Sequence, residues 1–553
     1  MSEAAVRPPD EEADERVEVD EPDAFEGRSP RDVLVDPLAF GAEVLKENPR
    51  RSVYRLRIGR SELVVKHYRE RGLGDAVKGA FGRSRARTER EIAAALVDAG
   101  LPGPAPVAWA RRAEGRLERW SALAMRAVRD ARPLGGYLED RFAPGDGRTA
   151  EKRPWVEAAA RLLGRLHRAG FDHRDFHGGN LLVEGGASGD GRGLVVVDLH
   201  RVARSSRISS TRRVRALADL LHTLRFAVDA EETRAAVAAY LEEIGAPRGE
   251  EDVARRTRLV EHAIARRETR RRRSRTRRCL RDGSEFRPIA AGGVRGYRRR
   301  GLPTDTLFEA IAAAREAIDD GGDAARSIAR RSSVAVVPAA GRSLAVKQYE
   351  GDGTRSARGR LTRGRAGRAY VAAHGLSVRG VPVPAVVAWL RTPDRAFLVV
   401  DEVAGAVPLS AASFRLSPGG PDESRAAEAA AAVADLLVRL AASGANVNDL
   451  SPKNVLLQLP AGGAVRAWLC DFDGVRLDRP PSRERWVRAL GQLNDLDPAI
   501  GTRLRLAVLR RLAAHVPSLR ARGTAREVAR RTAARASRTL RAPSPASLAG
   551  TAP

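Results

Sequence analysis

The pattern of apolar and polar positions predicts the same series of elements twice along the chain. Apolar, β-rich stretches come first, over Val53–Tyr68 and Val334–Tyr349, and a helix and a further strand region follow each of them. Longer helical patterns then run over Trp155–Arg168 and Ala426–Leu440. We therefore expect a small sheet lobe followed by a mostly helical lobe, in both halves of the chain.

Short landmarks recur in the same order in the two halves. LVVKHY, which contains Lys66, returns as LAVKQY, which contains Lys347, and LPGPAPVAW returns as VPVPAVVAW. HRDFHGGNLLV then matches VNDLSPKNVLL. The runs Leu194–Val197 and Ala467–Leu469, predicted as short buried strands, each lead to an aspartate in LVVVDLH and AWLCDFD. Recurrence at so long a period indicates a tandem duplication of whole domains, because the units of a solenoid are much shorter.

Composition sets the boundaries that we expect. The length of 553 residues suits two or three domains. Residues 1–30 are acidic, contain Pro and Gly and lack an apolar period, which predicts a disordered tail. We expect a first domain over 31–282, a second over 283–524 and a basic disordered tail over 525–553.

A run of arginines lies between the two predicted domains. Arg255–Arg278 carries twelve arginines and two glutamates, and the apolar residues Val253, Leu259, Val260 and Ile264 are too sparse for a core helix. We expect a basic helix that ends the first domain. It is a solvated face, an anchor to anionic lipid and a phosphorylated acceptor, or a nonspecific nucleic-acid patch; no specific nucleic acid is expected, because aromatic residues are scarce there.

The charge and cysteine content narrow the setting. The net charge is +28, yet only six of the 98 basic side chains are lysines, so the arginine excess is compatible with coding bias and a recurring lysine indicates a chemical demand. Cys279 and Cys470 are too isolated to suggest a disulfide framework or a thiolate zinc site. The acidic start lacks the features of an export signal and no segment reads as a membrane span, so we expect a cytoplasmic protein.

The repeated polar residues are those that phosphoryl transfer requires. Lys66 lies on an apolar strand from which an ammonium group can reach phosphate oxygens. Asp175 and Asn180 have the D-x-x-x-x-N spacing in which the aspartate serves the acceptor hydroxyl and the asparagine holds a metal, and Asp198 ends a strand from which its carboxylate can bind magnesium. The second half supplies the equivalent set, Lys347, Asp449, Asn454 and Asp471.

The sequence resembles the lipopolysaccharide core kinases of the Kdo/WaaP type, which have a protein-kinase-like fold. The resemblance rests on the order of VVK, GLPGPAPVAW, LLGRLHRAGFDHRDFHGGNLLV and VVVDLHR, on RSRARTER before the helix, and above all on Asp198-Leu-His-Arg in place of D-F-G. It covers about residues 45–225 and 325–500. The fold class it implies is α+β: tandem protein-kinase-like domains, each with a small antiparallel-sheet N-lobe and a mostly helical C-lobe.

The resemblance also implies an activity. A kinase of this type uses ATP and Mg²⁺ to phosphorylate a heptose or Kdo hydroxyl of the lipopolysaccharide core, at the inner face of the inner membrane. Lys66 would bind the α and β phosphates, Asp175 would be the base, and Asn180 and Asp198 would be magnesium ligands. In the second half Lys347 and Asp449 would be the catalytic pair, with Asn454 and Asp471 as the metal ligands.

Further residues around this set also have counterparts in the family. Glu89 stands where a helix glutamate would fix Lys66, with Glu91 close by as the alternative, and His173 and Arg174 would shape the catalytic loop. Neither half has a G-x-G-x-x-G loop or an A-P-E segment, which argues against an ordinary Ser/Thr protein kinase.

The second half departs further from the family pattern. Val447 and Asn448 replace the His-Arg pair, and Ala369 aligns with Glu89. We therefore expect the first domain to be the main catalyst and the second to be weak or chiefly a binding domain. Two alternatives stay open: another small-molecule or protein kinase on the same fold, and a pseudokinase scaffold without turnover.

Overall fold

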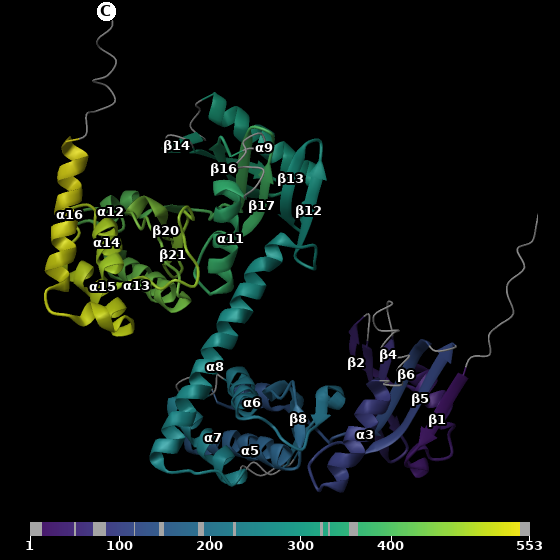
Figure 1. Ribbon diagram of the computed structural model, residues 1–553. Helices are drawn as coiled ribbons and strands as arrows, with labels where there is room; N and C mark the ends of the chain where they lie inside the picture. Colours follow the sequence, from purple (N-terminus) through teal and green to yellow (C-terminus); the bar gives the residue numbers. More distant parts are fainter. Residues whose placement is uncertain are drawn as a thin grey trace, which may run out of the picture. The chain divides into compact units, whose positions relative to one another are not determined.

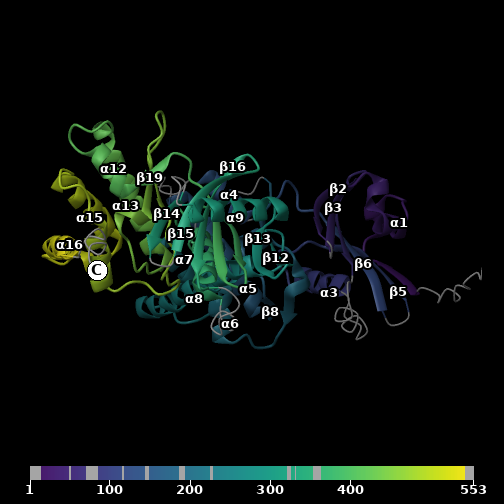
Figure 2. The ribbon, with the colours of Figure 1, turned by 90° about the horizontal axis from the view of Figure 1, so that it is seen from above.

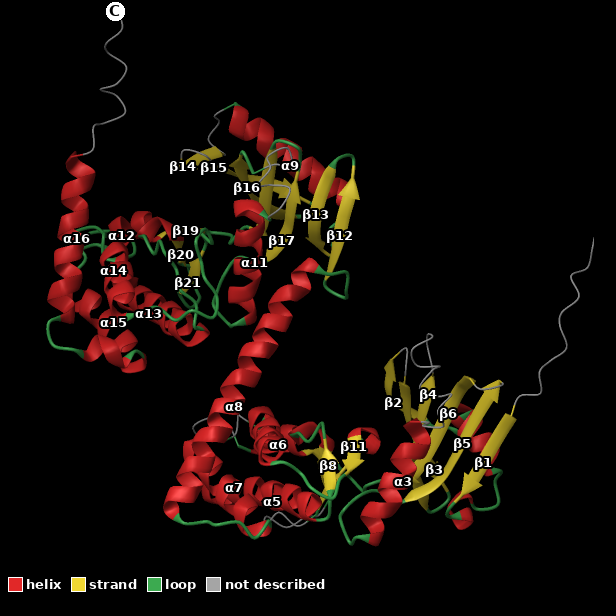
Figure 3. Cartoon of the chain, viewed as in Figure 1, coloured by secondary structure: helices red, strands yellow, loops and turns green. Residues whose placement is uncertain are grey.

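The computed structural model of the chain divides into two compact units, Met1–Glu268 and Thr269–Pro553 (Figure 1). It describes residues 14–48, 51–69, 85–114, 117–142, 149–185, 193–224, 228–320, 325–329, 332–352 and 363–541. In both units a strand-rich lobe precedes a helix-rich lobe (Figure 3).

The N-lobe of the first unit is an antiparallel sheet with the strand order β1-β5-β6-β4-β3-β2. Its strands are β1 (Asp14–Val19), β2 (Glu43–Asn48), β3 (Arg51–Ile58), β4 (Ser61–Arg69), β5 (Pro106–Glu114) and β6 (Leu117–Arg126). Side chains alternate across β6, so Ala122 and Ala124 pack into one core with α1 (Pro30–Val35), whereas Leu123 faces α3 (Arg85–Asp98).

The C-lobe of the first unit is built around one apolar core. Its helices are α4 (Leu134–Arg141), α5 (Thr149–Arg168), α6 (Ser210–Thr223), α7 (Ala230–Glu243) and α8 (Glu250–Thr276). Two short antiparallel ladders hold the segments that carry Asp175, Asn180 and Asp198. One ladder consists of β7 (Arg132–Pro133), β9 (Leu181–Val183) and β10 (Leu194–Val196). The other consists of β8 (Phe171–His173) and β11 (Val202–Arg204). The ladders place those segments beside α3 and α6.

The second unit has a seven-stranded antiparallel sheet in the order β12-β13-β17-β18-β16-β15-β14. The strands are β12 (Phe286–Ala291), β13 (Val294–Arg299), β14 (Ala325–Ala329), β15 (Ser332–Ala339), β16 (Arg342–Glu350), β17 (Val386–Arg391) and β18 (Arg395–Asp401). Helix α9 (Thr304–Asp319) packs on one face, against Phe397 and Val399 (Figure 2), and α11 (Gly364–Val378) shares the other face with Leu398.

The second C-lobe contains a small ladder of β19 (Ala406–Pro408), β20 (Val455–Gln458) and β21 (Arg466–Leu469). Its helices are α12 (Leu409–Leu416), α13 (Ala426–Ser443), α14 (Arg483–Leu493), α15 (Thr502–His515) and α16 (Thr524–Arg541). The helical pattern over Ala426–Leu440 thus forms α13, one face of which is buried in the core of this lobe.

Four strands follow the same order in both units, which confirms the expected fold class of tandem protein-kinase-like domains. The series β5-β6-β4-β3 corresponds to β17-β18-β16-β15. Lys66 lies between Val53 and Leu123 in the first sheet. Lys347 lies between Val334 and Leu398 in the second. The two lysines therefore occupy the same position on equivalent strands.

The predicted disordered tails are wrong where the structure describes them. Residues 14–30 form β1, which pairs with β5, and a turn whose Phe25 is fully buried. Residues 525–541 belong to α16, whose Val528 packs into the second core. An acidic composition did not prevent order because the arginine-rich strands and helices supply partners, such as Arg90 for Glu18. Residues 1–13 and 542–553 lie outside the described part.

The basic segment is helical, as expected, but it does belong to a core. Within α8, Val253 and Val260 are buried in the first C-lobe although Leu259 is half exposed. A spacing of seven residues puts these two apolar side chains on one helix face, and Ala263 and Ile264 pack partly buried against the same core. The two units divide within α8, before the expected boundary at residue 282.

The position of Phe25 leads to a stability prediction. Phe25→Ala should lower the free energy of unfolding by about 3–5 kcal/mol, because it leaves a cavity between the sheet and α1. Leu38→Ala is the control, since Leu38 is 52% exposed and should change the free energy by less than about 0.5 kcal/mol. Urea unfolding followed by circular dichroism measures both. Equal urea midpoints for Phe25→Ala and the unmodified chain would show that residues 14–30 do not contribute to the core.

Candidate active site

A buried ion pair joins the sheet of the first unit to its helix. The ammonium group of Lys66, on β4, lies 2.5 Å from Oε1 of Glu89, on α3. Tyr68, two residues along β4 and on the same face, donates a hydrogen bond to the other carboxylate oxygen. Burial and the neighbouring Glu89 carboxylate raise the pKa of Tyr68 well above its ordinary value, so its hydroxyl stays protonated. Glu89 thus has a partner on both oxygens.

Helix geometry decides between the two candidate glutamates. Ala86, Ala93 and Leu96 are buried on one face of α3, and Glu89 lies three, four and seven residues from them. Glu91 is two residues further on, which turns its side chain toward solvent, where it pairs with Arg87 at 2.8 Å. The carboxylate that contacts Lys66 is therefore that of Glu89.

Asp198 follows β10 and sits in a left-handed backbone conformation, with φ 63° and ψ 52°. Its Oδ1 accepts hydrogen bonds from Arg51, at 2.6 Å, and from His200, at 2.7 Å. Burial alone would raise the pKa of this carboxyl, but the His200 hydrogen bond and the charges of Lys66 and Arg51 hold the pKa well below its usual range. An ionised carboxylate in a strained backbone position is typical of a functional site.

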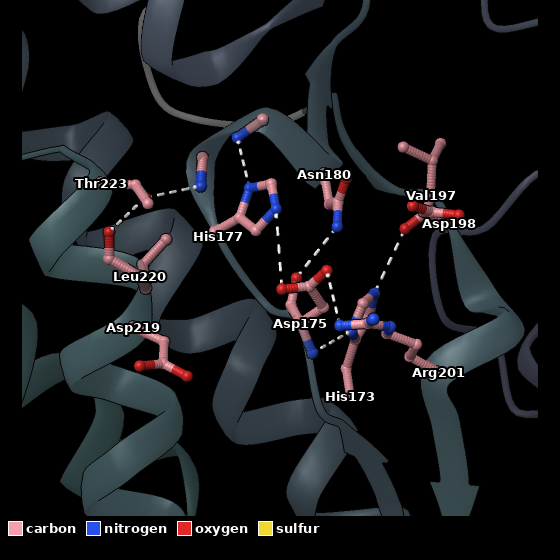
Figure 4. Close-up of polar contacts among 12 residues, drawn as sticks. His173, Asp175, His177, Asn180, Val197, Asp198, Arg201, Asp219, Leu220 and Thr223 are labelled. Carbon is pink, nitrogen blue, oxygen red and sulfur yellow. Dashed lines mark hydrogen bonds and ion pairs between the residues drawn. The ribbon is translucent and has the colours of Figure 1, made fainter. Parts of the chain in front are cut away.

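The loop after β8 carries the other predicted residues. The backbone N–H of Asp175 donates to Nδ1 of His173 at 3.2 Å, and Nε2 of the same ring lies 3.2 Å from the carbonyl of Val197. Burial lowers the pKa of His173, so the neutral ring accepts at Nδ1 and donates at Nε2. Asn180 donates from its side chain to the carbonyl of Asp175 at 3.0 Å (Figure 4). His173 therefore ties the Asp175 loop to the strand that leads to Asp198.

Helix α6 supports this loop from behind. The N–H of Gly178 donates to Oγ1 of Thr223 at 2.9 Å (Figure 4), and Arg212 forms an ion pair with Asp172 at 2.7 Å. A Cβ at Gly178 would lie 2.6 Å from the side chain of Leu224, so a larger residue there would displace this buried leucine where loop and helix approach closely. The carboxylate of Asp175 projects from this support toward Arg201, at 3.4 Å, and His177, at 3.8 Å.

The four predicted residues of the first unit are brought together through a series of hydrogen bonds. Glu89, the partner of Lys66, accepts from the N–H of Leu199 at 2.9 Å, directly after Asp198. The N–H of Val197, directly before Asp198, donates to the carbonyl of Asn180 at 2.9 Å. Asn180 in turn contacts Asp175. An ammonium group, an amide and two carboxylates therefore share one site between the lobes of this unit.

The donor set fits magnesium. Because the Asn180 amide nitrogen points to the Asp175 carbonyl, its oxygen is turned the other way, toward the side where Asp198 lies (Figure 4). The described residues hold no group of three or more His, Cys, Asp or Glu side chains placed to bind a metal. One carboxylate and one amide oxygen nevertheless suit Mg²⁺, which usually takes one or two protein carboxylates together with phosphates and water.

The second unit assembles an equivalent set with one change. The amide of Asn454 donates to the carbonyl of Asp449 at 3.2 Å, and the N–H of Cys470 donates to the carbonyl of Asn454 at 3.0 Å. Lys347 lies 3.0 Å from Oδ1 of Asp471 and 3.2 Å from Oδ2 of Asp473. Ala369, which aligns with Glu89, offers Lys347 no carboxylate from the helix, but Asp473 supplies one from the segment after β21.

Several contacts in these sites were not predicted from the sequence. Tyr68 and Tyr349 recur in the two landmarks LVVKHY and LAVKQY, and that recurrence was a usable signal. Arg51 and His200 on Asp198, and Asp473 on Lys347, depend on how distant segments meet in space. Arg174, predicted to shape the loop, contributes a backbone hydrogen bond to the carbonyl of Arg201.

The two lobes and the site between them define the class as kinase-like, and comparison with known proteins gives the family. The lipopolysaccharide kinase (Kdo/WaaP) family matches residues 39–242 and 319–498, which is more than half of the chain. The chain belongs to this family. The two matched segments each contain one of the sites described above.

Curated relatives resemble part of the chain. A 3-deoxy-D-manno-octulosonic acid kinase of Xanthomonas campestris pv. campestris (strain B100) is 35% identical over 133 residues, 23% of this chain and 49% of the relative. The kinase of the same name from Xanthomonas euvesicatoria pv. vesicatoria (strain 85-10) is 38% identical over 112 residues, 20% of this chain and 41% of the relative. The chain thus spans about half the length of the curated relatives it matches.

One solved structure, described as WaaP in complex with acyl carrier protein, is 25% identical with a TM-score of 0.34, covering 45% of this chain and 99% of that chain. Among the described residues of this protein, no helix has the length and apolar character needed to cross a bilayer.

The Lys66–Glu89 contact leads to a binding prediction. Glu89→Gln should weaken the affinity for a nucleotide with Mg²⁺ by about 10- to 100-fold, because the ammonium group loses the charge that holds it in place. Glu91→Gln, on the same helix but paired only at the surface, should change the affinity by less than about twofold. Isothermal titration calorimetry with a non-hydrolysable ATP analogue compares the two variants. A larger loss of nucleotide affinity in Glu91→Gln than in Glu89→Gln would show that Glu91 is the residue that positions Lys66.

Proposed function

We propose that this protein transfers the γ-phosphoryl group of ATP to a sugar hydroxyl of the lipopolysaccharide core, with the first unit as the main catalyst. The observation that carries the proposal is the convergence of Lys66, Asp175, Asn180 and Asp198 in one site of a chain that belongs to a lipopolysaccharide kinase family. The acceptor follows from the relatives, which are named as kinases of 3-deoxy-D-manno-octulosonic acid.

Each residue has a role that its surroundings support. Lys66 is held by Glu89 at the surface where the two lobes of the unit meet, so its ammonium group binds the α and β phosphates. Asp175 lies on the supported loop with its carboxylate between His177 and Arg201, and it orients the acceptor hydroxyl and takes its proton. The acceptor oxygen forms a bond to the γ-phosphorus, the bond from that phosphorus to the β,γ-bridging oxygen breaks, and ADP leaves.

Asn180 and Asp198 would hold magnesium in this scheme. When bound, Mg²⁺ supplies the positive charge that offsets the charge developing on the phosphate oxygens. Asp198 stays ionised because Lys66, Arg51 and His200 surround it, and the same contacts keep its carboxylate in place. The left-handed backbone of Asp198 is maintained by the hydrogen bonds of its two neighbours, Val197 and Leu199.

The proposal includes a peripheral position at the inner face of the inner membrane. Helix α8 presents exposed arginines on the sides not buried in the C-lobe, among them Arg255, Arg258 and Arg266. Clusters of this kind bind the anionic headgroups of a lipid surface or the phosphates of a lipid-linked acceptor.

Asp175→Asn tests the proposed chemistry. The transfer rate from labelled ATP should fall by about 10²- to 10⁴-fold, whereas the nucleotide affinity should change little, because the residue acts on the acceptor hydroxyl. Asp140→Asn is the matched control: Asp140 is an exposed residue of α4 paired with Arg132, and its loss should leave the rate unchanged. The assay uses a panel of Kdo-terminated and heptose-terminated lipid acceptors together with a generic protein substrate.

The same panel separates the alternatives. Transfer to the protein substrate and to none of the lipid acceptors would contradict the proposed sugar acceptor and would indicate a protein kinase on the same fold. An Asp175→Asn variant as active as the unmodified chain would contradict catalysis by the first unit, and a Lys347→Ala variant that loses more activity than Lys66→Ala would assign the reaction to the second.

A further inference from the structure

In both units one carboxylate receives a lysine and a tyrosine from the same strand, but the carboxylate comes from different places. In the first unit Lys66 and Tyr68 meet at Glu89, on the helix. In the second, Lys347 contacts Asp473 at 3.2 Å and Tyr349 donates to Asp473 at 3.0 Å. Asp473 lies after β21, in the segment that also carries Asp471.

The strand positions of these donors are equivalent, so the comparison is between like residues. Lys66 and Lys347 each pair with a valine on one neighbouring strand and a leucine on the other. Tyr68 and Tyr349 follow two residues later and are both buried. The two donors, a lysine ammonium group and a tyrosine hydroxyl, therefore have the same strand positions in both units.

The helix of the second unit has changed its contribution. Ala369 stands at the position of Glu89 and is buried, so α11 offers no carboxylate there. Arg365, one helical turn earlier on the same face, instead contacts Oδ2 of Asp473 at 3.0 Å. Its guanidinium and the Lys347 ammonium both lie over the ring of Tyr349, with distances to the ring centroid of 5.4 Å and 5.1 Å. Arg85 stands at the position equivalent to Arg365 in the first unit, where the helix itself supplies the anion; in the second unit the helix supplies no anion, and its arginine contacts one that comes from the loop.

We propose that Asp473 is the positioning residue of a second nucleotide site, where it replaces the missing helix glutamate and holds Lys347 toward the phosphates. This inference rests on the proposed use of a nucleotide by the fold, and it is independent of the acceptor. It assigns to the second unit a binding site that is organised differently from the first, although both serve the same ligand class.

Two observations favour positioning over permanent masking of the lysine. The side chain of Lys347 is 12% exposed and that of Lys66 is 9% exposed, so the second lysine is no more enclosed than the first. In addition, Oδ1 of Asp449 is buried and accepts no hydrogen bond from the described residues, so this oxygen at the base position still requires a donor. A collapsed, ligand-free pocket would be expected to satisfy that oxygen.

The test measures nucleotide binding to the full chain in a Lys66→Ala background, so that the second site is observed by itself. Calorimetric titration uses Mg²⁺ and a non-hydrolysable ATP analogue. Asp473→Ala should weaken the affinity by about tenfold or more, as expected for loss of a group that orients a ligand-binding side chain. Adding Ala369→Glu to Asp473→Ala, which rebuilds the arrangement of the first unit, should return the affinity to within about threefold.

Ala369→Gln in the Asp473→Ala background is the matched control, because it has the size of glutamate without the charge. It should not restore binding. Melting temperatures of all variants identify any that fail to fold, and Asp473→Asn, which keeps the side-chain volume, gives the same comparison without a cavity.

The inference is overturned if the Lys66→Ala chain binds no nucleotide, if folded Asp473→Ala or Asp473→Asn binds as well as or better than its parent, or if glutamine at position 369 rescues as well as glutamate. Because no acceptor is present, failure of the proposed sugar phosphorylation would leave these results unaffected.

Discussion

The arrangement of both units depends on one interaction, that of a lysine on an interior strand of the sheet with a carboxylate; Lys66 is buried and Lys347 is partly buried. Removing one member of a buried ion pair typically costs about 3–5 kcal/mol, because the remaining charge is left uncompensated. In the first unit this requirement fixes α3 against the sheet through Glu89, which is fully buried. Glu89 also accepts the N–H of Leu199, so the same carboxylate sets the position of Asp198 in the C-lobe.

This constraint explains how the two units could diverge without losing the site. The lysine tolerates a different source for its carboxylate as long as the charge lies at the same point. Asp473 meets that condition from the loop after β21, and Arg365 supplies the additional contact that a loop residue needs to stay in place. The loss of the helix glutamate in the second unit is therefore a relocation of negative charge from the helix to the loop after β21.

Local patterns predicted the repeated core of the fold because they reflect local physics. The alternation over Val53–Tyr68 and the helical period over Trp155–Arg168 gave strands and a helix close to those observed. The helical period could also have identified Glu89, and not Glu91, as the partner of Lys66, since Ala86, Ile92 and Leu96 mark the buried face of α3. Composition misled at the ends of the chain, where β1 is ordered by pairing with β5, a partner distant in sequence.

The parts of the site that could not be predicted are contacts between segments far apart in the chain. Arg51 meets Asp198 across 147 positions, and Lys347 meets Asp473 across 126. A single sequence gives the identity of such residues but not their distance. Asp473, the second aspartate of AWLCDFD, was visible in the sequence because LVVVDLH has His200 at that position. Its role as the partner of Lys347 could be recognised only together with the missing glutamate of α11, about a hundred residues earlier in the chain.

The most direct measurement is the number of Mg²⁺-nucleotide sites per chain, determined by calorimetric titration of the unmodified protein. The expected result is two sites, one of which is weakened when Lys66 is replaced by alanine and the other when Lys347 is replaced. A chain that binds no nucleotide, or whose binding is the same in both alanine variants as in the unmodified protein, would contradict it.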